Sequence, residues 1–263
     1  MRIFFSVGEP SGDEHAAGLI GELRTRCPDL VATGFGGPLM QPLFEESGGE
    51  LVYPLTDLAV MGFAKVVPML GRFYRLVKQA EAIFQTDPPD AVVLVDFPGF
   101  NWWIARKARA AGIPVFYYLP PQLWAWAPWR IKKVRRFVDH VLCGLPFEYD
   151  WYTSRGVSAE YVGHPFFDEV ANHTLDTEFL ATYQNTPGPT VALLPGSRTQ
   201  EVSFNWPLLQ QVVDRLARQH PSARFLVANY KSEHRRHCEA RFLMNQRAMG
   251  ESGRVEFHVG RTS

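Results

Sequence analysis

One carboxylate stands at the end of a wholly apolar run. Residues 91–95 (Ala-Val-Val-Leu-Val) lead into Asp96, which is followed by a Phe-Pro-Gly-Phe-Asn segment. Burial beside such a run disfavours the charged carboxylate and raises its pKa, which suits Asp96 to take a proton from a hydroxyl group. The alternative is that Asp96 caps a helix starting at Trp102, but Asn101 stands closer to that helix and can cap it. The pattern predicts Asp96 as a general base.

A second candidate site follows the apolar run at residues 3–7. Its glycines allow a tight turn, and the helix expected after it offers unpaired N–H groups. The loop is neither GxGxxG nor a Walker loop, and its two acidic residues would repel a pyrophosphate. We therefore predict hydroxyl recognition, with helix capping by Ser11 or Asp13 as the alternative. The residues of this loop are Gly8, Glu9, Pro10, Ser11, Gly12 and Asp13.

The segment after residues 191–194 repeats the plan of strand, glycine turn and helix with a basic residue at the turn. It reads Pro-Gly-Ser-Arg-Thr-Gln-Glu from position 195. The guanidinium of Arg198 can add bidentate contacts to a phosphate that the helix N-terminus already favours. Ser197 and Gln200 match a capping box, which leaves Arg198 unexplained. We predict a diphosphate site around Arg198.

Two further stretches combine apolar or aromatic residues with basic ones. Tryptophans at 124, 126 and 129 precede five basic residues within positions 130–136. Such a segment can stack on nucleic acid or lie beside sugar phosphates or lipid headgroups, and a solvated basic helix face is the alternative.

Residues 58–78 are more apolar than a surface helix requires, and basic residues recur at 72, 75 and 78. This stretch could dock on a bilayer, although core packing is the commoner explanation for an apolar helix. The residues predicted to face lipid are Val66, Val67, Met69, Leu70, Phe73 and Leu76.

Short apolar runs alternate with longer amphipathic segments, and this alternation predicts a doubly wound α/β fold. Runs that are apolar throughout are typical of parallel strands covered on both faces. Strands are expected at 3–7, 91–95, 115–118, 141–143, 191–194, 224–228 and 255–259, and helices at 13–26, 70–84, 102–111, 201–219 and 233–248. The carboxyl ends of the strands then carry all three candidate sites.

Two domains are expected. Breakers at 187–189 precede a fresh strand, so we predict a complete domain over 1–172, a linker over 173–188 with a helix at 176–183, and a second domain over 189–263. The last expected strand is followed by Gly-Arg-Thr-Ser, which normally opens a helix. We therefore expect a truncated or split sequence whose second domain is only partly present.

Composition limits the function classes. The 27 basic and 27 acidic residues cancel, which gives no global attraction to nucleic acid or to an anionic membrane. Cys27, Cys143 and Cys238 are far apart, so neither a disulfide framework nor a zinc site is expected. The N-terminal apolar run is too short for a signal peptide, and no run reaches about 18 apolar residues. We expect a globular protein inside the cell, with no metal and no nucleic-acid partner.

Seven motifs in order over residues 3–202 resemble those of lipid-A-disaccharide synthases. They are GEPSGD (8–13), GGPLM (36–40), LAVMG (58–62), DFPGFN (96–101), WAW (124–126), LPFE (145–148) and LPGSR with EV (194–198 and 201–202). The resemblance implies a GT-B fold with one complete Rossmann-like domain and the first half of a second. It also implies an inverting, metal-independent transfer from UDP-2,3-diacylglucosamine to 2,3-diacylglucosamine 1-phosphate, giving the lipid A disaccharide and UDP.

The resemblance also implies roles for residues. Asp96 matches the base and Arg198 the nucleotide-phosphate contact, while Asn101, Trp126 and Glu201 join the loop residues Gly8, Glu9, Ser11, Gly12 and Asp13 as substrate contacts. The first domain would bind the acceptor and the second the donor, with no cofactor, at the cytoplasmic side of the inner membrane; a homodimer stays open. Two alternatives remain: another GT-B enzyme such as a UDP-N-acetylglucosamine epimerase, and a noncatalytic remnant that binds lipid or a partner.

Overall fold

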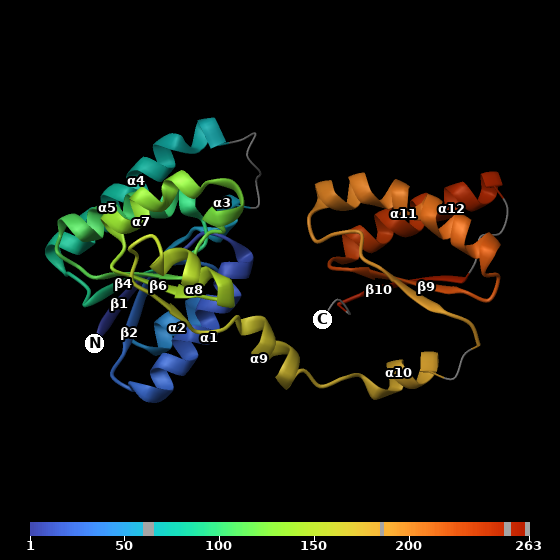
Figure 1. Cartoon of the computed structure of the whole chain (residues 1–263), viewed down its shortest axis with the longest axis horizontal. Helices are drawn as coiled ribbons and strands as arrows, with labels where there is room; N and C mark the ends of the chain where they lie inside the picture. The colour runs from blue at the N-terminus through green and yellow to red at the C-terminus, as the bar shows by residue number, and fades with distance from the viewer. Residues whose placement is uncertain (60–65, 185–186, 250–253, 261–263) are drawn as a thin grey trace. The chain divides into compact units, whose positions relative to one another are not determined.

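The chain folds into two compact units. The computed structural model describes residues 1–59, 66–184, 187–249 and 254–260, and it divides into unit 1 (Met1–Ala171) and unit 2 (Asn172–Ser263) (Figure 1). Within the described residues, none of the helices is both long enough and apolar enough to cross a bilayer.

Unit 1 is built on a seven-stranded parallel sheet in the order β3-β2-β1-β4-β5-β6-β7. The chain builds outward from β1 in one direction and from β4 in the other. The carboxyl ends of β1 and β4 therefore form a topological switch point, where open α/β sheets bind ligands. The strands are β1 (Arg2–Val7), β2 (Val31–Gly36), β3 (Leu51–Pro54), β4 (Ala91–Val95), β5 (Val115–Tyr118), β6 (His140–Cys143) and β7 (Ala159–Tyr161).

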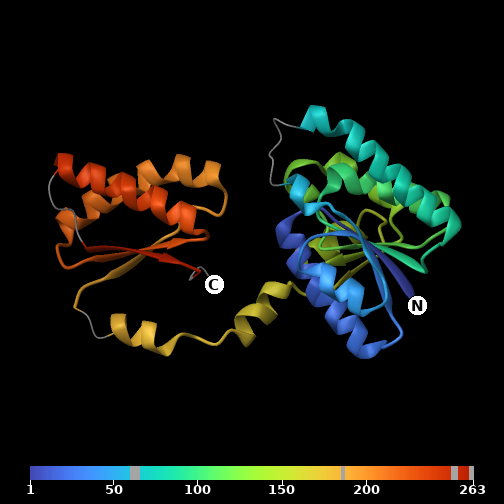
Figure 2. The same ribbon diagram turned by 180° about the vertical axis from the view of Figure 1, so that it is seen from behind.

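Helices cover both faces of this sheet, which is why its central strands are apolar throughout. Phe4, Val92 and Leu94 pack under one helix layer, whereas Phe5 and Val93 pack under the other. The first layer contains α4 (Val66–Thr86), α5 (Pro98–Ala110) and α7 (Ile131–Phe137), and the second contains α1 (Pro10–Arg26) and α2 (Met40–Glu46) (Figures 1 and 2). The remaining helices are α3 (Thr56–Ala59), α6 (Leu123–Trp126), α8 (Pro146–Thr153), α9 (Pro165–Asn172) and a 3₁₀ turn at Pro128–Arg130.

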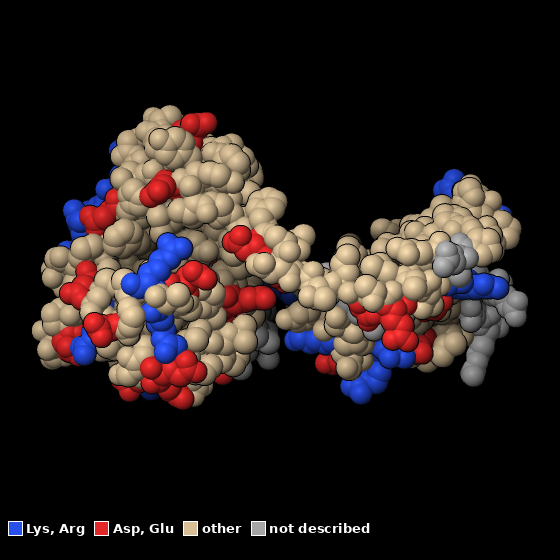
Figure 3. Space-filling model, turned by 90° about the horizontal axis from the view of Figure 1, so that it is seen from below, with Lys and Arg blue, Asp and Glu red and all other residues tan. Residues whose placement is uncertain are grey.

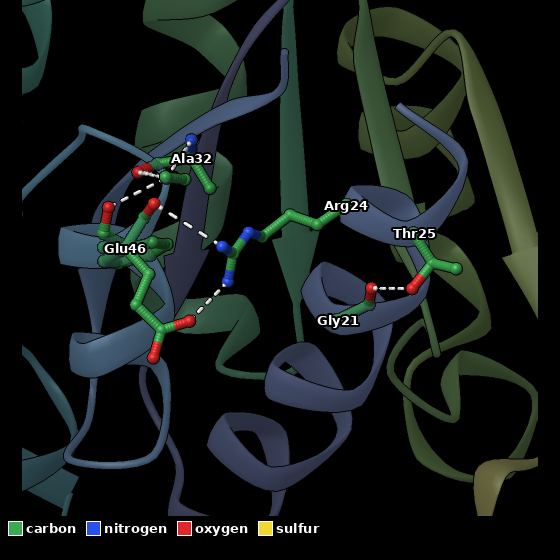
Figure 4. Close-up of polar contacts among 7 residues, drawn as sticks. Gly21, Arg24, Thr25, Ala32 and Glu46 are labelled. Atoms are coloured by element: carbon green, nitrogen blue, oxygen red, sulfur yellow. Dashed lines mark hydrogen bonds and ion pairs between the residues drawn. The ribbon is translucent and has the colours of Figure 1, made fainter. Parts of the chain in front are cut away.

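Exposed ion pairs on the surface contribute little to the stability of the fold. Arg24 of α1 donates from Nη1 to Oε2 of Glu46 in α2 at 2.7 Å and from Nη2 to the Glu46 carbonyl at 3.4 Å (Figure 4). An exposed pair of this kind contributes about 0–1 kcal/mol. Basic and acidic side chains are interspersed on the face of unit 1 seen in Figure 3, as the zero net charge suggests.

Unit 2 contains a three-stranded parallel sheet in the order β10-β9-β8. Its strands are β8 (Thr190–Leu193), β9 (Arg224–Asn229) and β10 (Arg254–Val259). Two long helices, α11 (Thr199–Gln219) and α12 (Ser232–Met249), pack on it through a core that includes Trp206, Phe225 and Phe242.

The range predicted as a linker is partly structured. It contains α10 (Thr177–Gln184), whose Tyr183 hydroxyl donates to Oε2 of Glu256 in β10 at 2.6 Å. The ring of Phe179 also meets that of His258 edge-on at 5.2 Å. These contacts attach α10 to unit 2.

All seven expected strands are present, and the α/β fold with parallel sheets is confirmed. Three strands were missed. β2 (Val-Ala-Thr-Gly-Phe-Gly) is rich in glycine, β3 ends in proline, and β7 has only three residues. Gly34 of β2 has φ +139°, and a Cβ there would lie 2.1 Å from the Phe5 carbonyl oxygen, so the close approach of β1 requires glycine.

Candidate functional site

Two separate sequence motifs meet at the switch point of unit 1. A Cβ added to Gly8 would lie 2.2 Å from Cδ1 of Phe97, and one added to Gly12 would lie 3.5 Å from Oδ2 of Asp96. Gly8, between β1 and α1, and Gly12, in the first turn of α1, therefore both lie against the turn between β4 and α5. Glycine is required at position 8 because the Phe97 ring fills the space of a side chain.

Asp96 lies in an unusual backbone turn. Asp96 and Phe97 have φ of +46° and +41°, although neither is glycine. Left-handed conformations cost such residues about 1–2 kcal/mol each and persist only where neighbours hold them. Here the Asp96 carbonyl oxygen accepts hydrogen bonds from Tyr117 Oη at 2.7 Å and Asn101 Nδ2 at 2.8 Å. The turn places the Asp96 carboxylate at the carboxyl end of β4.

The environment of Asp96 makes it a stronger base than an ordinary aspartate. Burial, together with the negative charge of Glu9, raises the pKa of Asp96 to about 6. A carboxyl group with this pKa is mostly ionised at pH 7 and accepts a proton more readily than an exposed one. Glu9 thus acts on Asp96 electrostatically.

Asn101 has a different place from the one predicted. It lies inside α5, is fully buried, and donates from Nδ2 to the carbonyls of Ser6, Val95 and Asp96. It neither caps α5 nor reaches solvent, so the prediction of a direct substrate contact is wrong. Its amide joins the ends of β1 and β4.

The Asp13 carboxylate is also used in hydrogen bonds within the protein. Its carboxylate accepts hydrogen bonds from the backbone N–H groups of Gly37, Leu39 and Met40 at 2.9–3.2 Å and so caps the start of α2. Burial raises the pKa of Asp13, and these three bonds oppose that rise. Neither hydroxyl recognition nor capping of its own helix fits this geometry. Ser11, in the first turn of α1, is exposed, and Glu9, just before the helix, is half-buried, so both remain candidates.

A histidine pair near this edge was missed. His15 of α1 is buried, and its ring meets those of His164 and Phe166 edge-on at 5.4 and 5.3 Å. His164 and Phe166 stack with 5.0 Å between ring centroids. Burial and the neighbouring His164 lower the pKa of His15, and Glu169 opposes this. A single histidine two residues after Asp13 gives no sequence signal of this pairing.

In the tryptophan motif, Trp124 bonds to a buried carboxyl group, whereas Trp126 is half exposed. Trp124 donates to Oε1 of the buried Glu148 at 3.0 Å, and the Leu145 N–H donates to its Oε2 at 3.3 Å. Burial raises the pKa of Glu148, and the Trp124 bond opposes that rise. Trp126 is half exposed, with the Arg130 guanidinium 4.7 Å above its ring. Trp126 is therefore accessible, and its role as a substrate contact stays a prediction.

In unit 2 the predicted diphosphate turn is held by an internal carboxylate. Oε2 of Glu201 accepts hydrogen bonds from the backbone N–H groups of Ser197 and Arg198, both at 3.1 Å, and Oε1 pairs with Arg198 Nη1 at 3.2 Å. These bonds lower the pKa of Glu201, that from the Arg198 N–H most strongly. Glu201, rather than Gln200, completes the capping box, and it serves the turn rather than pointing to a ligand. The Arg198 side chain is three-quarters exposed.

A buried histidine supports the same turn and was missed. His234 of α12 places Nε2 3.2 Å from the hydroxyl of Thr199, the first residue of α11. The contact joins the N-terminal turns of α11 and α12 at the carboxyl edge of the sheet.

The predicted lipid-facing segment is only partly exposed. Leu76 lies in the core at 4% exposure, which corrects its assignment, and Met69 and Phe73 are half-buried against the same core. Leu70 is 57% exposed, and Tyr74, one turn further on, is 64% exposed. The side chains of Val66 and Val67 lie outside the described residues.

No group of three or more His, Cys, Asp or Glu residues in the described part of the chain is arranged to hold a metal ion.

Two α/β units, each with a parallel sheet and polar residues at its carboxyl edge, define a GT-B-like fold. The fold is similar to that of the UDP-N-acetylglucosamine 2-epimerase from Neisseria meningitidis, solved bound to UDP-GlcNAc, with a TM-score of 0.62 and 12% identity over 99% of this chain and 73% of that one. The family model for lipid-A-disaccharide synthetase matches residues 3–250. The chain belongs to this family.

Two curated relatives in this family share more than a third of their aligned residues with this chain. The lipid-A-disaccharide synthase of Myxococcus xanthus is 38% identical over 92% of this chain, and that of Alkalilimnicola ehrlichii is 40% identical over 86%. The chain spans 62% and 59% of the lengths of these two relatives.

Because the pKa of Asp96 is raised, replacing Asp96 by a neutral residue should stabilise the folded state, by an amount that depends on pH. Because the folded pKa is about 6 against an ordinary 3.8, ionisation destabilises the folded state increasingly between about pH 4 and 6. Asp96→Asn should therefore raise the free energy of unfolding by about 1–2 kcal/mol at pH 8, allowing for partial screening by solvent, and by little at pH 4. Urea unfolding at both pH values measures this. The exposed Asp150→Asn is the control, and an equal gain in both variants would contradict the assignment.

Proposed function

We propose that the protein is an inverting glycosyltransferase that joins UDP-2,3-diacylglucosamine to 2,3-diacylglucosamine 1-phosphate, forming the lipid A disaccharide and releasing UDP. The observation that carries this proposal is the Asp96 carboxyl group, half-buried at the switch point with its pKa raised to about 6. Membership of the lipid-A-disaccharide synthase family supports the choice of substrates.

In the proposed reaction Asp96 takes the proton of an acceptor hydroxyl as the hydroxyl oxygen attacks the anomeric carbon of the donor. The new glycosidic bond forms on the face opposite the breaking bond to UDP, so the configuration inverts. Asp96 is suited to this step because its raised pKa makes it a better base while it remains ionised at neutral pH. The glycines at positions 8 and 12 let the backbone of the first motif approach Asp96 and Phe97 closely.

The leaving diphosphate would be stabilised in unit 2. The Arg198 guanidinium is exposed and uses one nitrogen, Nη1, to bond to Glu201. Its other N–H donors therefore remain for phosphate oxygens. The α11 N-terminus adds a favourable dipole. The charge on the departing UDP would thus meet a guanidinium group and a helix N-terminus, both of which can contribute to transition-state stabilisation.

The decisive experiment measures how fast the two substrates are converted to the disaccharide and UDP. In a form of the protein extended to the full length of its relatives, we expect the two substrates to give the disaccharide and UDP, and we expect Asp96→Asn to lower kcat by about 100-fold or more while KM changes only a few-fold. Mass spectrometry of the product and an enzymatic UDP assay measure this. Asp150→Asn controls for loss of an unrelated carboxylate. Unchanged turnover in Asp96→Asn would remove Asp96 from the mechanism.

The Arg198 assignment makes a binding prediction that does not need turnover. Arg198→Ala should weaken UDP about 10-fold, since a charge-assisted hydrogen bond of about 1.4 kcal/mol is lost, and leave uridine unchanged. Calorimetric titration of the two ligands measures the difference. Arg218→Ala, an exposed arginine in the last turn of the same helix, is the matched control. Equal loss of uridine affinity would argue against a diphosphate contact.

We also propose peripheral contact with the cytoplasmic face of the inner membrane, through the helix layer of α4, α5 and α7. The sequence of these three helices contains one acidic residue, Glu81, which pairs with Lys78 and Lys107. Basic side chains are exposed on all three helices at positions 72, 75, 106, 132, 133, 135 and 136. Leu70 and Tyr74 add exposed apolar area on α4. Basic and apolar side chains on one layer favour an anionic bilayer surface.

Replacing Leu70 and Tyr74 together by serine should reduce binding to phosphatidylglycerol vesicles several-fold without unfolding the chain, because both side chains are exposed. Vesicle co-sedimentation measures binding, and circular dichroism checks the fold. The control replaces Leu208 and Val212, an exposed apolar pair with the same spacing on α11. If both double variants sediment like the wild type, this surface is not the one that meets lipid.

A further inference from the structure

Two buried side chains from neighbouring elements donate to one backbone carbonyl, that of Asp96, and a third side chain bonds to one of them. Tyr117 in β5 donates its hydroxyl to it at 2.7 Å, and Asn101 in α5 donates from Nδ2 at 2.8 Å. Ser6 in β1 in turn donates its hydroxyl to Oδ1 of Asn101 at 2.7 Å. All three side chains are fully buried.

The network fixes the orientation of the Asn101 amide. Because Oδ1 accepts from Ser6, the Nδ2 group faces the carbonyls of Ser6 and Val95, both at 3.1 Å, as well as that of Asp96. One amide thus fastens the last residues of β1 and β4 to each other. A buried amide satisfied in this way is costly to disturb, since each lost partner leaves an unpaired polar group.

The Asp96 carbonyl needs such partners because the chain turns left-handed there. With φ of +46° at Asp96 and +41° at Phe97, the backbone leaves the direction of β4 immediately after Val95. Two adjacent left-handed residues that are not glycine relax to ordinary conformations unless other contacts hold them. Relaxation would rotate the Asp96 carboxyl away from its half-buried position.

We propose that Tyr117 and Asn101 are positioning residues, which hold the Asp96 carbonyl so that its carboxyl group stays in the place where it can act as a base. The proposal rests on the proposed function of Asp96. Neither residue touches substrate in this scheme, because both are buried. They act on the backbone of the base, and Ser6 acts through Asn101.

Tyr152 offers a matched comparison for Tyr117. It is also a fully buried tyrosine, and its hydroxyl donates to one backbone carbonyl, that of Pro121, at 3.3 Å. Removing either hydroxyl leaves one buried carbonyl with a partner fewer and has a similar structural cost. Only the Tyr117 hydroxyl bonds to Asp96.

The test is the titration of the Asp96 carboxyl group, followed by carboxyl carbon-13 NMR and assigned by its loss in Asp96→Asn. The charged and titratable groups that act on it are Glu9, from the loop before α1, and Tyr117 itself, both unchanged in charge by the variants near neutral pH. In Tyr117→Phe the pKa should fall from about 6 towards its ordinary value by about one unit, because the relaxed turn lets water reach the carboxylate. In Tyr152→Phe it should stay at the wild-type value.

Equal pKa values in Tyr117→Phe and Tyr152→Phe would overturn the proposal, as would a rise in Tyr117→Phe. Ser6→Ala provides a second, milder variant if Tyr117→Phe does not fold, and it should shift the pKa in the same direction by a smaller amount. This measurement is independent of turnover. A shifted pKa combined with full turnover in Asp96→Asn would overturn the base assignment and leave the positioning network intact.

Discussion

The tie between the ends of β1 and β4 is the constraint on which the candidate site depends. In a parallel sheet these adjacent strands send their loops in different directions, so a gap opens between the loops at the carboxyl edge. The Asn101 amide joins the two strand ends, and the glycines of the first loop let its backbone lie against the Asp96 turn. The proposed base Asp96 and its electrostatic neighbour Glu9 are consequently held together by elements distant in sequence.

Several acidic residues in the sequence motifs serve the backbone of the protein itself. Asp13 accepts three N–H groups at the start of α2, Glu201 accepts two before α11, and Glu148 accepts the N–H of Leu145. In each case a carboxylate supplies the acceptor that a helix start or turn lacks. Asp96 differs, because its backbone carbonyl accepts the hydrogen bonds from Tyr117 and Asn101, while its carboxyl group is the proposed base.

The sequence predicted the strands and helices that are long and periodic, together with Asp96 as the polar end of an apolar strand. It did not predict β2, where glycines replace the apolar pattern, or the attachment of α10 to unit 2, which depends on a contact between Tyr183 and Glu256. The roles of Asp13 and Asn101 were also out of reach, since Asp13 bonds to Gly37, 24 residues away, and the Asn101 network includes Ser6, 95 residues away. Local spacing shows which residues are polar at a strand end, and tertiary contacts decide which of them face the backbone.

The contact between Gly8 and Phe97 has a consequence for how this family can vary. A side chain at position 8 and the aromatic ring at position 97 would occupy the same volume, since a Cβ on Gly8 falls 2.2 Å from the ring. A larger residue at one position is therefore tolerated only with a smaller one at the other, and a glycine at position 97 would also relieve its left-handed backbone. Selection acts on the two positions as one unit, so substitutions there should be correlated across related sequences although the residues are 89 positions apart.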